Sequence, residues 1–263
     1  MVTFTDFWPR LTITSFWIIV SLICFHSGPD VALIYWGGIH FIALYELQTL
    51  LSVSWISLTI NMLTNNAVFL LLARPYFGYP RVPAEMLLPL AFVPFAAALI
   101  DSRTNFWKSS VSSISYIWIT IPFHICFKLT TIDTKLLMGV LTVTWIMDAG
   151  AYFSGHIFGR TPLLTRISPR KTVEGTIGGA VITFLTAHIV SAYVPFISHA
   201  DWMVVALISS TFGHLGDLFE SMFKRALEVK DSGTFMGKEI GGLLDRMDSV
   251  LFAVVFVNAY LAL

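Results

Sequence analysis

Charged residues are scarce in this sequence. Asp, Glu, Lys and Arg make up 12% of its 263 residues, whereas a soluble domain normally carries about 25%. The two signs cancel to a net charge of zero, and no basic stretch is interleaved with aromatic residues, so nothing indicates nucleic acid as a partner. Cysteine is also scarce. Cys24 and Cys126 lie far apart in apolar runs, which argues against a disulfide framework or a cysteine metal site and favours inert packing residues.

Apolar residues, in contrast, make up 56% of the chain. They fall into nine runs, each close to the roughly 20 residues that a helix needs to cross a bilayer. The first run has little basic sequence before it and no small-residue cleavage pattern after it, so we interpret it as a mature helix and not as a signal peptide. The sequence therefore predicts an all-α, polytopic integral membrane helix bundle with about nine transmembrane helices. The runs cover approximately residues 11–26, 31–52, 53–73, 84–101, 109–129, 136–156, 174–195, 202–224 and 247–263.

The basic residues between these runs predict how the bundle is oriented. Cytoplasmic connections of membrane proteins carry an excess of Lys and Arg. With nine spans, twelve of the sixteen basic residues fall on one side of the membrane, and only Arg74, Arg81, Lys128 and Lys135 fall on the other. We therefore expect the N-terminus and the charged loops of the second half in the cytoplasm, and the C-terminus outside.

Polar chemistry is concentrated in the second half of the chain, where residues 145–250 hold ten of the sixteen acidic residues. Ionised side chains are costly beside lipid, so a group of them among membrane helices indicates an ion, phosphate or substrate site. We expect residues 1–135 to form an N-terminal transmembrane scaffold. Residues 136–263 are expected to form a catalytic transmembrane region with cytoplasmic charged loops.

The densest group of charges lies in residues 216–249. If this stretch is helical, Asp245 and Asp248 project from one face because they are three residues apart, and Asp217 and Ser221 share a face at a spacing of four. Carboxylates that converge from two helix ends suit Mg²⁺, and interleaved Lys and Arg suit phosphate oxygens. The charged residues here are Asp217, Glu220, Lys224, Arg225, Glu228, Lys230, Asp231, Lys238, Glu239, Asp245, Arg246 and Asp248.

A second polar cluster precedes this stretch. Asp148 lies deep in an apolar run, so we expect it to be paired or to face a cavity, and a structural hydrogen bond within the bundle is the alternative. Residues 168–175 are typical of a phosphate-handling loop before a helix. Pro169 fixes the turn, Arg170 and Lys171 supply positive charge, and free N–H groups at the helix start bind anions. An ordinary basic cytoplasmic loop is the alternative.

Ordered motifs between residues 148 and 249 resemble those of one enzyme family. They are Asp148-Ala-Gly-Ala-Tyr152, Ser168-Pro-Arg-Lys-Thr-x-Glu-Gly175, Gly216-Asp217-Leu-x-Glu-Ser221, Ser221-x-x-Lys224-Arg225, Lys230-Asp231-Ser-Gly and Gly241-Gly242-x-x-Asp245-Arg246-x-Asp248. Their order is similar to that of phosphatidate cytidylyltransferase, also called CDP-diacylglycerol synthase. One element departs: the family usually has Pro-x-His-Gly-Gly, whereas residues 236–242 read Met-Gly-Lys-Glu-Ile-Gly-Gly, without the histidine and with one extra residue.

The resemblance implies that CTP and phosphatidate react to give CDP-diacylglycerol and pyrophosphate for phospholipid synthesis. It also implies Mg²⁺ with a possible second cation, a membrane lipid environment and a homodimer. We expect a bacterial protein of the inner membrane with its active site on the cytoplasmic side. A degenerate family member is the alternative that the absent histidine raises.

The resemblance also assigns roles to single residues. The metal ligands it implies are Asp217, Asp245 and Asp248. The catalytic residues are these three together with Asp231 and Lys171. The residues that bind CTP or the lipid phosphate are Ser168, Arg170, Lys171, Thr172, Ser221, Lys224, Arg225, Lys230 and Arg246. Two structural interpretations stay open: Arg246 as a partner of Asp217 or Asp245, and Glu220 with Lys224 as an i,i+4 ion pair.

Two other functions fit part of the pattern. A CTP-dependent lipid-alcohol kinase of the polyprenol or phytol type would also need a metal, CTP and a membrane acceptor. A membrane transporter would place its charged residues at a midplane site. The gathering of both charged clusters on the expected cytoplasmic side argues against the transporter.

Overall fold

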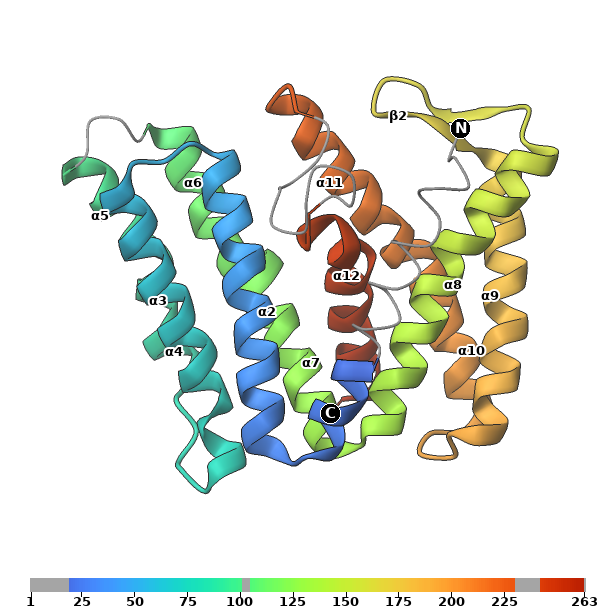
Figure 1. Ribbon diagram of the computed structural model, residues 1–263, viewed down its shortest axis with the longest axis horizontal. Helices are drawn as coiled ribbons and strands as arrows, with labels where there is room; N and C mark the ends of the chain where they lie inside the picture. The colour runs from blue at the N-terminus through green and yellow to red at the C-terminus, as the bar shows by residue number, and fades with distance from the viewer. Residues whose placement is uncertain (1–18, 101–104, 230–241, 263) are drawn as a thin grey trace.

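The molecule is a bundle of helices that run side by side (Figure 1). The computed structural model describes residues 19–100, 105–229 and 242–262, and residues 19–26 are helical. The elements that follow are α2 (Pro29–Leu50), α3 (Trp55–Ala73), η1 (Arg74–Phe77), α4 (Ala84–Leu87), η2 (Leu88–Phe92), α5 (Val93–Ile100), α6 (Phe106–Ser115), η3 (Tyr116–Thr120), α7 (Ile121–Ile132), α8 (Thr134–Phe158), β1 (Pro162–Leu164), β2 (Ser168–Thr172), α9 (Val173–Tyr193), α10 (His199–Ile208), η4 (Ser209–Gly213), α11 (His214–Ala226) and α12 (Leu244–Leu261).

Five helical stretches among the described residues are long and apolar enough to cross a membrane. They are Trp55–Phe77, Phe106–Ile132, Thr134–Phe158, Val173–Tyr193 and His199–Ala226. The polytopic helix bundle expected from the sequence is therefore confirmed, whereas the count of nine spans remains a prediction. The run expected near residues 84–101 is a shorter apolar helix, Glu85–Ile100, in which Pro89 and Pro94 interrupt the regular backbone hydrogen bonds.

The turn between α2 and α3 shows why that boundary is hard to see in the sequence. No glycine or proline marks it. The chain turns instead at Ser52, which adopts a positive φ of 48°. Ser54 then caps α3 by accepting a hydrogen bond from the N–H of Ser57 at 3.3 Å. The boundary expected near residue 52 is thus confirmed, and the backbone turn at Ser52 with the side-chain cap of Ser54 takes the place of a glycine or proline.

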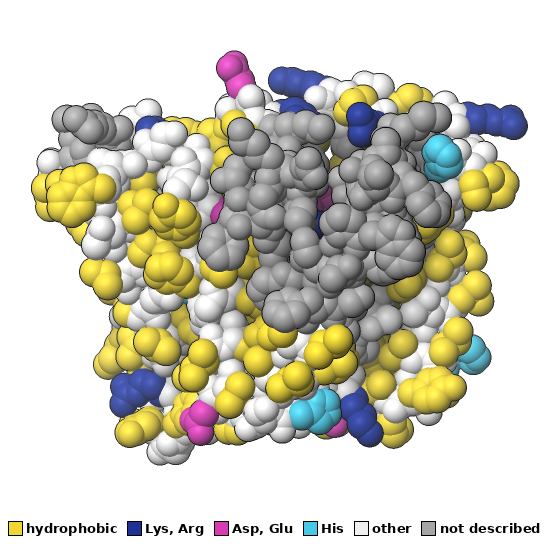
Figure 2. Space-filling model, in the orientation of Figure 1, with side chains coloured by type: hydrophobic (Ala, Val, Ile, Leu, Met, Phe, Trp, Pro, Cys, Tyr) yellow, Lys and Arg dark blue, Asp and Glu magenta, His cyan; other side chains and the backbone are white. Residues whose placement is uncertain are grey.

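The charged connections of the second half lie at one end of the bundle. The β-hairpin and the C-terminal end of α11 lie at the upper end in Figure 1, whereas α12 begins below them and runs down to the C-terminus at the lower end. Most Lys, Arg, Asp and Glu side chains visible in Figure 2 lie near these two ends, with mainly hydrophobic side chains between them. This distribution suits a bundle whose middle faces lipid.

The segment expected to be a phosphate-handling loop is a strand that leads into a helix. β2 pairs antiparallel with β1, with Pro162 opposite Thr172. Thr172 then caps α9, because its hydroxyl accepts a hydrogen bond from the N–H of Gly175 at 3.1 Å. Glu174 accepts from the N–H groups of Arg160 and Thr161 and holds the base of the hairpin against α9. The helix start was expected; the strand was not.

Glycines allow α8 and α9 to pack with their backbones in close contact. A Cβ on Gly179 would lie 2.8 Å from the backbone nitrogen of Ala151 and 2.9 Å from the carbonyl oxygen of Met147. A Cβ on Gly178 would lie 2.4 Å from the Cβ of Ser154. Small residues are typical of such interfaces between membrane helices. The small residues that follow Asp148 therefore have a packing role.

We expect Gly179→Ala to lower the free energy of unfolding by about 1–3 kcal/mol, because overpacking forces backbone or side-chain shifts. Gly38→Ala is the matched control, since a Cβ at Gly38 would have nothing within 4 Å. Thermal unfolding of the detergent-solubilised protein measures both. Equal melting temperatures for the two variants would contradict the close contact between α8 and α9.

Candidate active site

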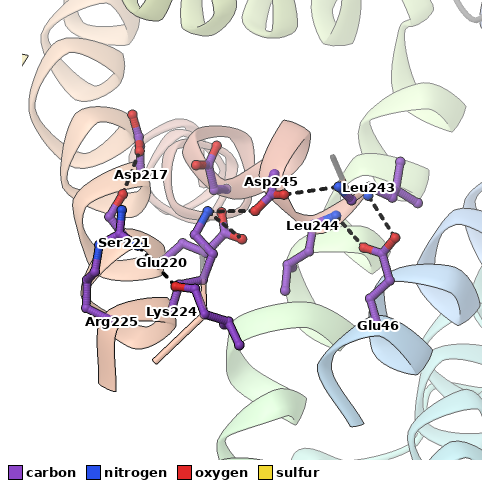
Figure 3. Close-up of polar contacts among 12 residues, drawn as sticks. Glu46, Asp217, Glu220, Ser221, Lys224, Arg225, Leu243, Leu244 and Asp245 are labelled. Carbon is purple, nitrogen blue, oxygen red and sulfur yellow. Dashed lines mark hydrogen bonds and ion pairs between the residues drawn. The ribbon is translucent and has the colours of Figure 1, made fainter. Parts of the chain in front are cut away.

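The close packing of α11 on α12 forms the base of the site. A Cβ on Gly216 would lie 2.6 Å from the carbonyl oxygen of Asp248, so only glycine allows the two helices to approach so closely at this level. Asp217 follows Gly216 directly, and Asp248 lies in the second turn of α12. The contact therefore brings the acidic face of α11 against the first turns of α12 (Figure 3).

Two lysines connect these helices to each other and to the hairpin. The Nζ of Lys171, on β2, lies 2.5 Å from Oδ2 of Asp217. The Nζ of Lys224 lies 2.6 Å from Oδ1 of Asp245, which crosses from α11 to α12 (Figure 3). The Nζ of Lys224 also lies 3.5 Å from Oε1 of Glu220. This is the i,i+4 ion pair that the sequence analysis gave as a structural alternative. The two ion pairs thus join residues that are 46 positions apart (Lys171 and Asp217) and 21 positions apart (Lys224 and Asp245).

The carboxylates of the site are more numerous than its ammonium groups. Glu220 is fully buried, and neither of its oxygens has a hydrogen-bond partner among the described residues. Asp248 is 8% exposed, and the nearby charges of Asp148 and Asp217 repel its own. We call these side chains the carboxylate–lysine cluster. Its members are Asp148, Lys171, Asp217, Glu220, Lys224, Asp245 and Asp248.

The donor set of this cluster fits a divalent cation by its chemistry. Five carboxylates face two ammonium groups, and Mg²⁺ prefers oxygen ligands of this kind. The geometry differs from a preformed metal site. Among the described residues, no group of three His, Cys, Asp or Glu side chains is arranged to hold a metal ion. Lysines instead lie beside Asp217 and Asp245, two of the three expected ligands.

The other expected site residues fall into two groups. Ser221 lies within the cluster, where its hydroxyl donates to Oδ1 of Asp217 at 3.4 Å. Thr172 has a local role as the cap of α9, and Arg225 donates to the carbonyl oxygen of Val229 at 3.1 Å, at the end of α11. These contacts occupy side chains that the resemblance assigns to substrate, and their roles toward substrate remain predictions.

Three further expected residues lie at the rim of the site. Ser168 is half-buried at the start of β2, opposite Leu164. Arg170 and Arg246 are exposed residues. Lys230, Asp231 and the segment without the family histidine, up to Gly241, lie outside the described residues.

Glu46, on α2, is a site neighbour that the sequence interpretation missed. Its carboxylate is 2% exposed and accepts hydrogen bonds from the backbone N–H groups of Leu243 at 3.0 Å and Leu244 at 2.9 Å (Figure 3). The sequence does contain an indication of its importance, because Glu46 is the one acidic residue in the apolar run 31–52. The rule that drew attention to Asp148 applies equally to it.

The chain is similar to known proteins over nearly its whole length. The family model described as the cytidylyltransferase family matches residues 8–263. A phosphatidate cytidylyltransferase of Staphylococcus aureus is 30% identical over 250 residues, which cover 93% of this chain and 95% of the relative. One of Bacillus subtilis is 38% identical over 170 residues, which cover 63% of this chain and 62% of the relative. One of Staphylococcus saprophyticus is 28% identical over 248 residues, which cover 93% and 95%. The chain therefore belongs to the cytidylyltransferase family.

Proposed function

We propose that this protein transfers the cytidylyl group of CTP to phosphatidate, giving CDP-diacylglycerol and pyrophosphate. The observation that carries the proposal is the carboxylate–lysine cluster at one end of an apolar bundle. There a lysine from the hairpin and another from α11 are paired with carboxylates of α11 and α12. Such a site offers positive charge to phosphate groups and carboxylates to a cation, and it lies within reach of a lipid substrate.

The reaction depends on neutralising negative charge more than on transferring a proton. The second pKa of a phosphate monoester is about 6, so the phosphatidate oxygen is already largely ionised at neutral pH and needs no general base. That oxygen forms a bond to the α-phosphorus of CTP, and the bond from this phosphorus to the bridging oxygen of pyrophosphate breaks. The barrier lies in bringing two anions together, which positioned cations lower.

The cluster supplies positive charge through its two lysines, and its carboxylates would hold a cation that adds more. Lys171 and Lys224 would exchange their carboxylate partners for phosphate oxygens when substrate binds. Asp217, Asp245 and Asp248 would hold Mg²⁺, which would neutralise the charge of the triphosphate. The histidine that the family usually carries is not needed for this chemistry, since no step requires a base.

Several finer assignments extend this proposal. The remaining substrate contacts would come from Ser168, Arg170, Thr172, Ser221, Arg225, Lys230 and Arg246, with Asp231 as a further carboxylate. The basic connections favour the cytoplasmic side of a bacterial inner membrane for this end of the bundle. The second cation and the homodimer are expectations from the family resemblance alone.

Labelled CTP distinguishes this reaction from its nearest alternative. We expect the α-phosphate of CTP to enter the lipid product when the protein is incubated with phosphatidate and Mg²⁺. A lipid-alcohol kinase would instead transfer the γ-phosphate. Thin-layer chromatography of the lipid fraction with each label decides between them. Ion flux through protein-containing vesicles, without any CTP-dependent lipid product, would favour a transporter.

Asp248→Asn should lower turnover at least about a hundredfold, because it removes a carboxylate that would hold the cation, and with it part of the charge neutralisation that the reaction needs. The control is Glu85→Gln, since Glu85 is an exposed acidic residue on α4, outside the cluster. Turnover is measured per folded protein, with melting temperature as the measure of folding. Near-normal activity of Asp248→Asn would be incompatible with its assignment as a ligand.

Two neighbouring basic residues provide a test of the lysine role. Lys171 is paired with Asp217 inside the cluster, whereas Arg170 is exposed. We expect Lys171→Ala to lower kcat/KM for CTP at least about tenfold, the equivalent of one charge-assisted hydrogen bond, and Arg170→Ala to lower it less. Steady-state kinetics with CTP as the varied substrate measures both. A larger loss from Arg170→Ala would move the phosphate contact to the rim.

A further inference from the structure

Glu46 contacts the start of α12, a helix of the site whose own N-cap residue makes no capping hydrogen bond. The first backbone N–H groups of a helix have no partner within the helix, and a polar side chain just before the helix normally accepts from them. The residue at this position of α12 is Leu243, whose side chain makes no such hydrogen bond. Glu46 fills the role from α2, across 197 and 198 positions of sequence.

The position of this contact matters because α12 carries its acidic residues immediately afterwards. Asp245 follows Leu244 directly and Asp248 lies one turn further along. Asp245 in turn accepts from the N–H of Gly242 at 3.0 Å and pairs with Lys224. The residue at which α12 begins therefore determines where both carboxylates point, and the Glu46 carboxylate is bonded to that start through both of its oxygens.

α2 is itself held firmly at this level. Gln48 is fully buried, and its side-chain oxygen accepts from Asn61 of α3 and from Ser112 of α6, both at 3.1 Å. Two residues before Gln48, the Glu46 carboxylate thus projects from a fixed helix. A buried carboxylate in a membrane bundle is costly unless its charge is matched. Here the positive end of the α12 dipole and the two N–H groups provide the match.

We propose that Glu46 is a positioning residue for cytidylyl transfer: it fixes the start of α12 and so holds Asp245 and Asp248 in register with Lys224 and the cation. This inference rests on the proposed function. It assigns a role in the reaction to the half of the chain that the sequence marks only as scaffold. In this proposal Glu46 acts through the backbone N–H groups of Leu243 and Leu244.

The test uses three substitutions in the full chain. Glu46→Gln keeps the shape and one accepting oxygen but loses the charge, and Glu46→Leu loses both acceptors. We expect kcat to fall about tenfold for Glu46→Gln and about a hundredfold for Glu46→Leu, the loss that a misplacement near 1 Å produces. Glu85→Gln serves as the control, since the exposed Glu85 lies outside the site.

A readout that is independent of activity separates positioning from overall stability. Amide hydrogen exchange should become faster at the first turn of α12 in Glu46→Leu, with α8 and α9 unchanged. The Mg²⁺ concentration for half-maximal activity should rise in both variants. If instead kcat per folded protein stays at the wild-type value while only the melting temperature falls, Glu46 has a purely structural role and the inference is overturned.

Failure of the proposed function gives a different result. In that case the wild-type protein itself would not place the α-phosphate of CTP into lipid. Exchange would then test only the structural part of the inference, that Glu46 fixes the start of α12. Faster exchange confined to the start of α12 would support it, and unchanged exchange in Glu46→Leu would overturn it.

Discussion

Charge compensation within an apolar bundle is the constraint on which this structure depends. An ionised side chain beside membrane helices is costly unless an opposite charge or a set of hydrogen bonds matches it. For three of its carboxylates, the protein meets this requirement with contacts between elements that are distant in sequence: Lys171 with Asp217, Lys224 with Asp245, and Glu46 with the start of α12. The same contacts hold the hairpin, α2, α11 and α12 together at one end of the bundle.

This arrangement also prepares the site for anionic substrates. In the free protein the lysines neutralise carboxylates, and a phosphate oxygen offers an ammonium group nearly the same partner that a carboxylate does. In the proposed reaction, binding of a nucleotide together with a divalent cation would therefore replace these ion pairs with others of the same kind. The cluster holds more carboxylates than lysines, and Glu220 is fully buried without a hydrogen-bond partner among the described residues. In the proposed reaction, a divalent cation would balance this excess of negative charge.

The sequence predicts the helices well because their signal is local. Long apolar runs separated by charged connections identify the described helices to within a few residues, and the start of α9 after Thr172 and the α2–α3 boundary near Ser52 were both expected. The β-hairpin was not, since a strand of five residues such as Ser168–Thr172 has too short a pattern to distinguish from a loop. The composition marks an apolar run at residues 84–101 but does not show how its prolines divide it.

The site was predictable only where its residues lie within one motif. The spacing of Asp217 and Ser221, and of Asp245 and Asp248, follows from helical geometry. The pairing of each lysine with its carboxylate does not, because several partners of opposite charge satisfy the same motif. Glu46 shows the limit most clearly. A motif relates residues that are near in sequence, whereas a side chain from a distant helix can cap another helix if the fold brings the two together. A residue in the apparent scaffold can therefore determine the geometry of a site whose motifs all lie elsewhere in the sequence.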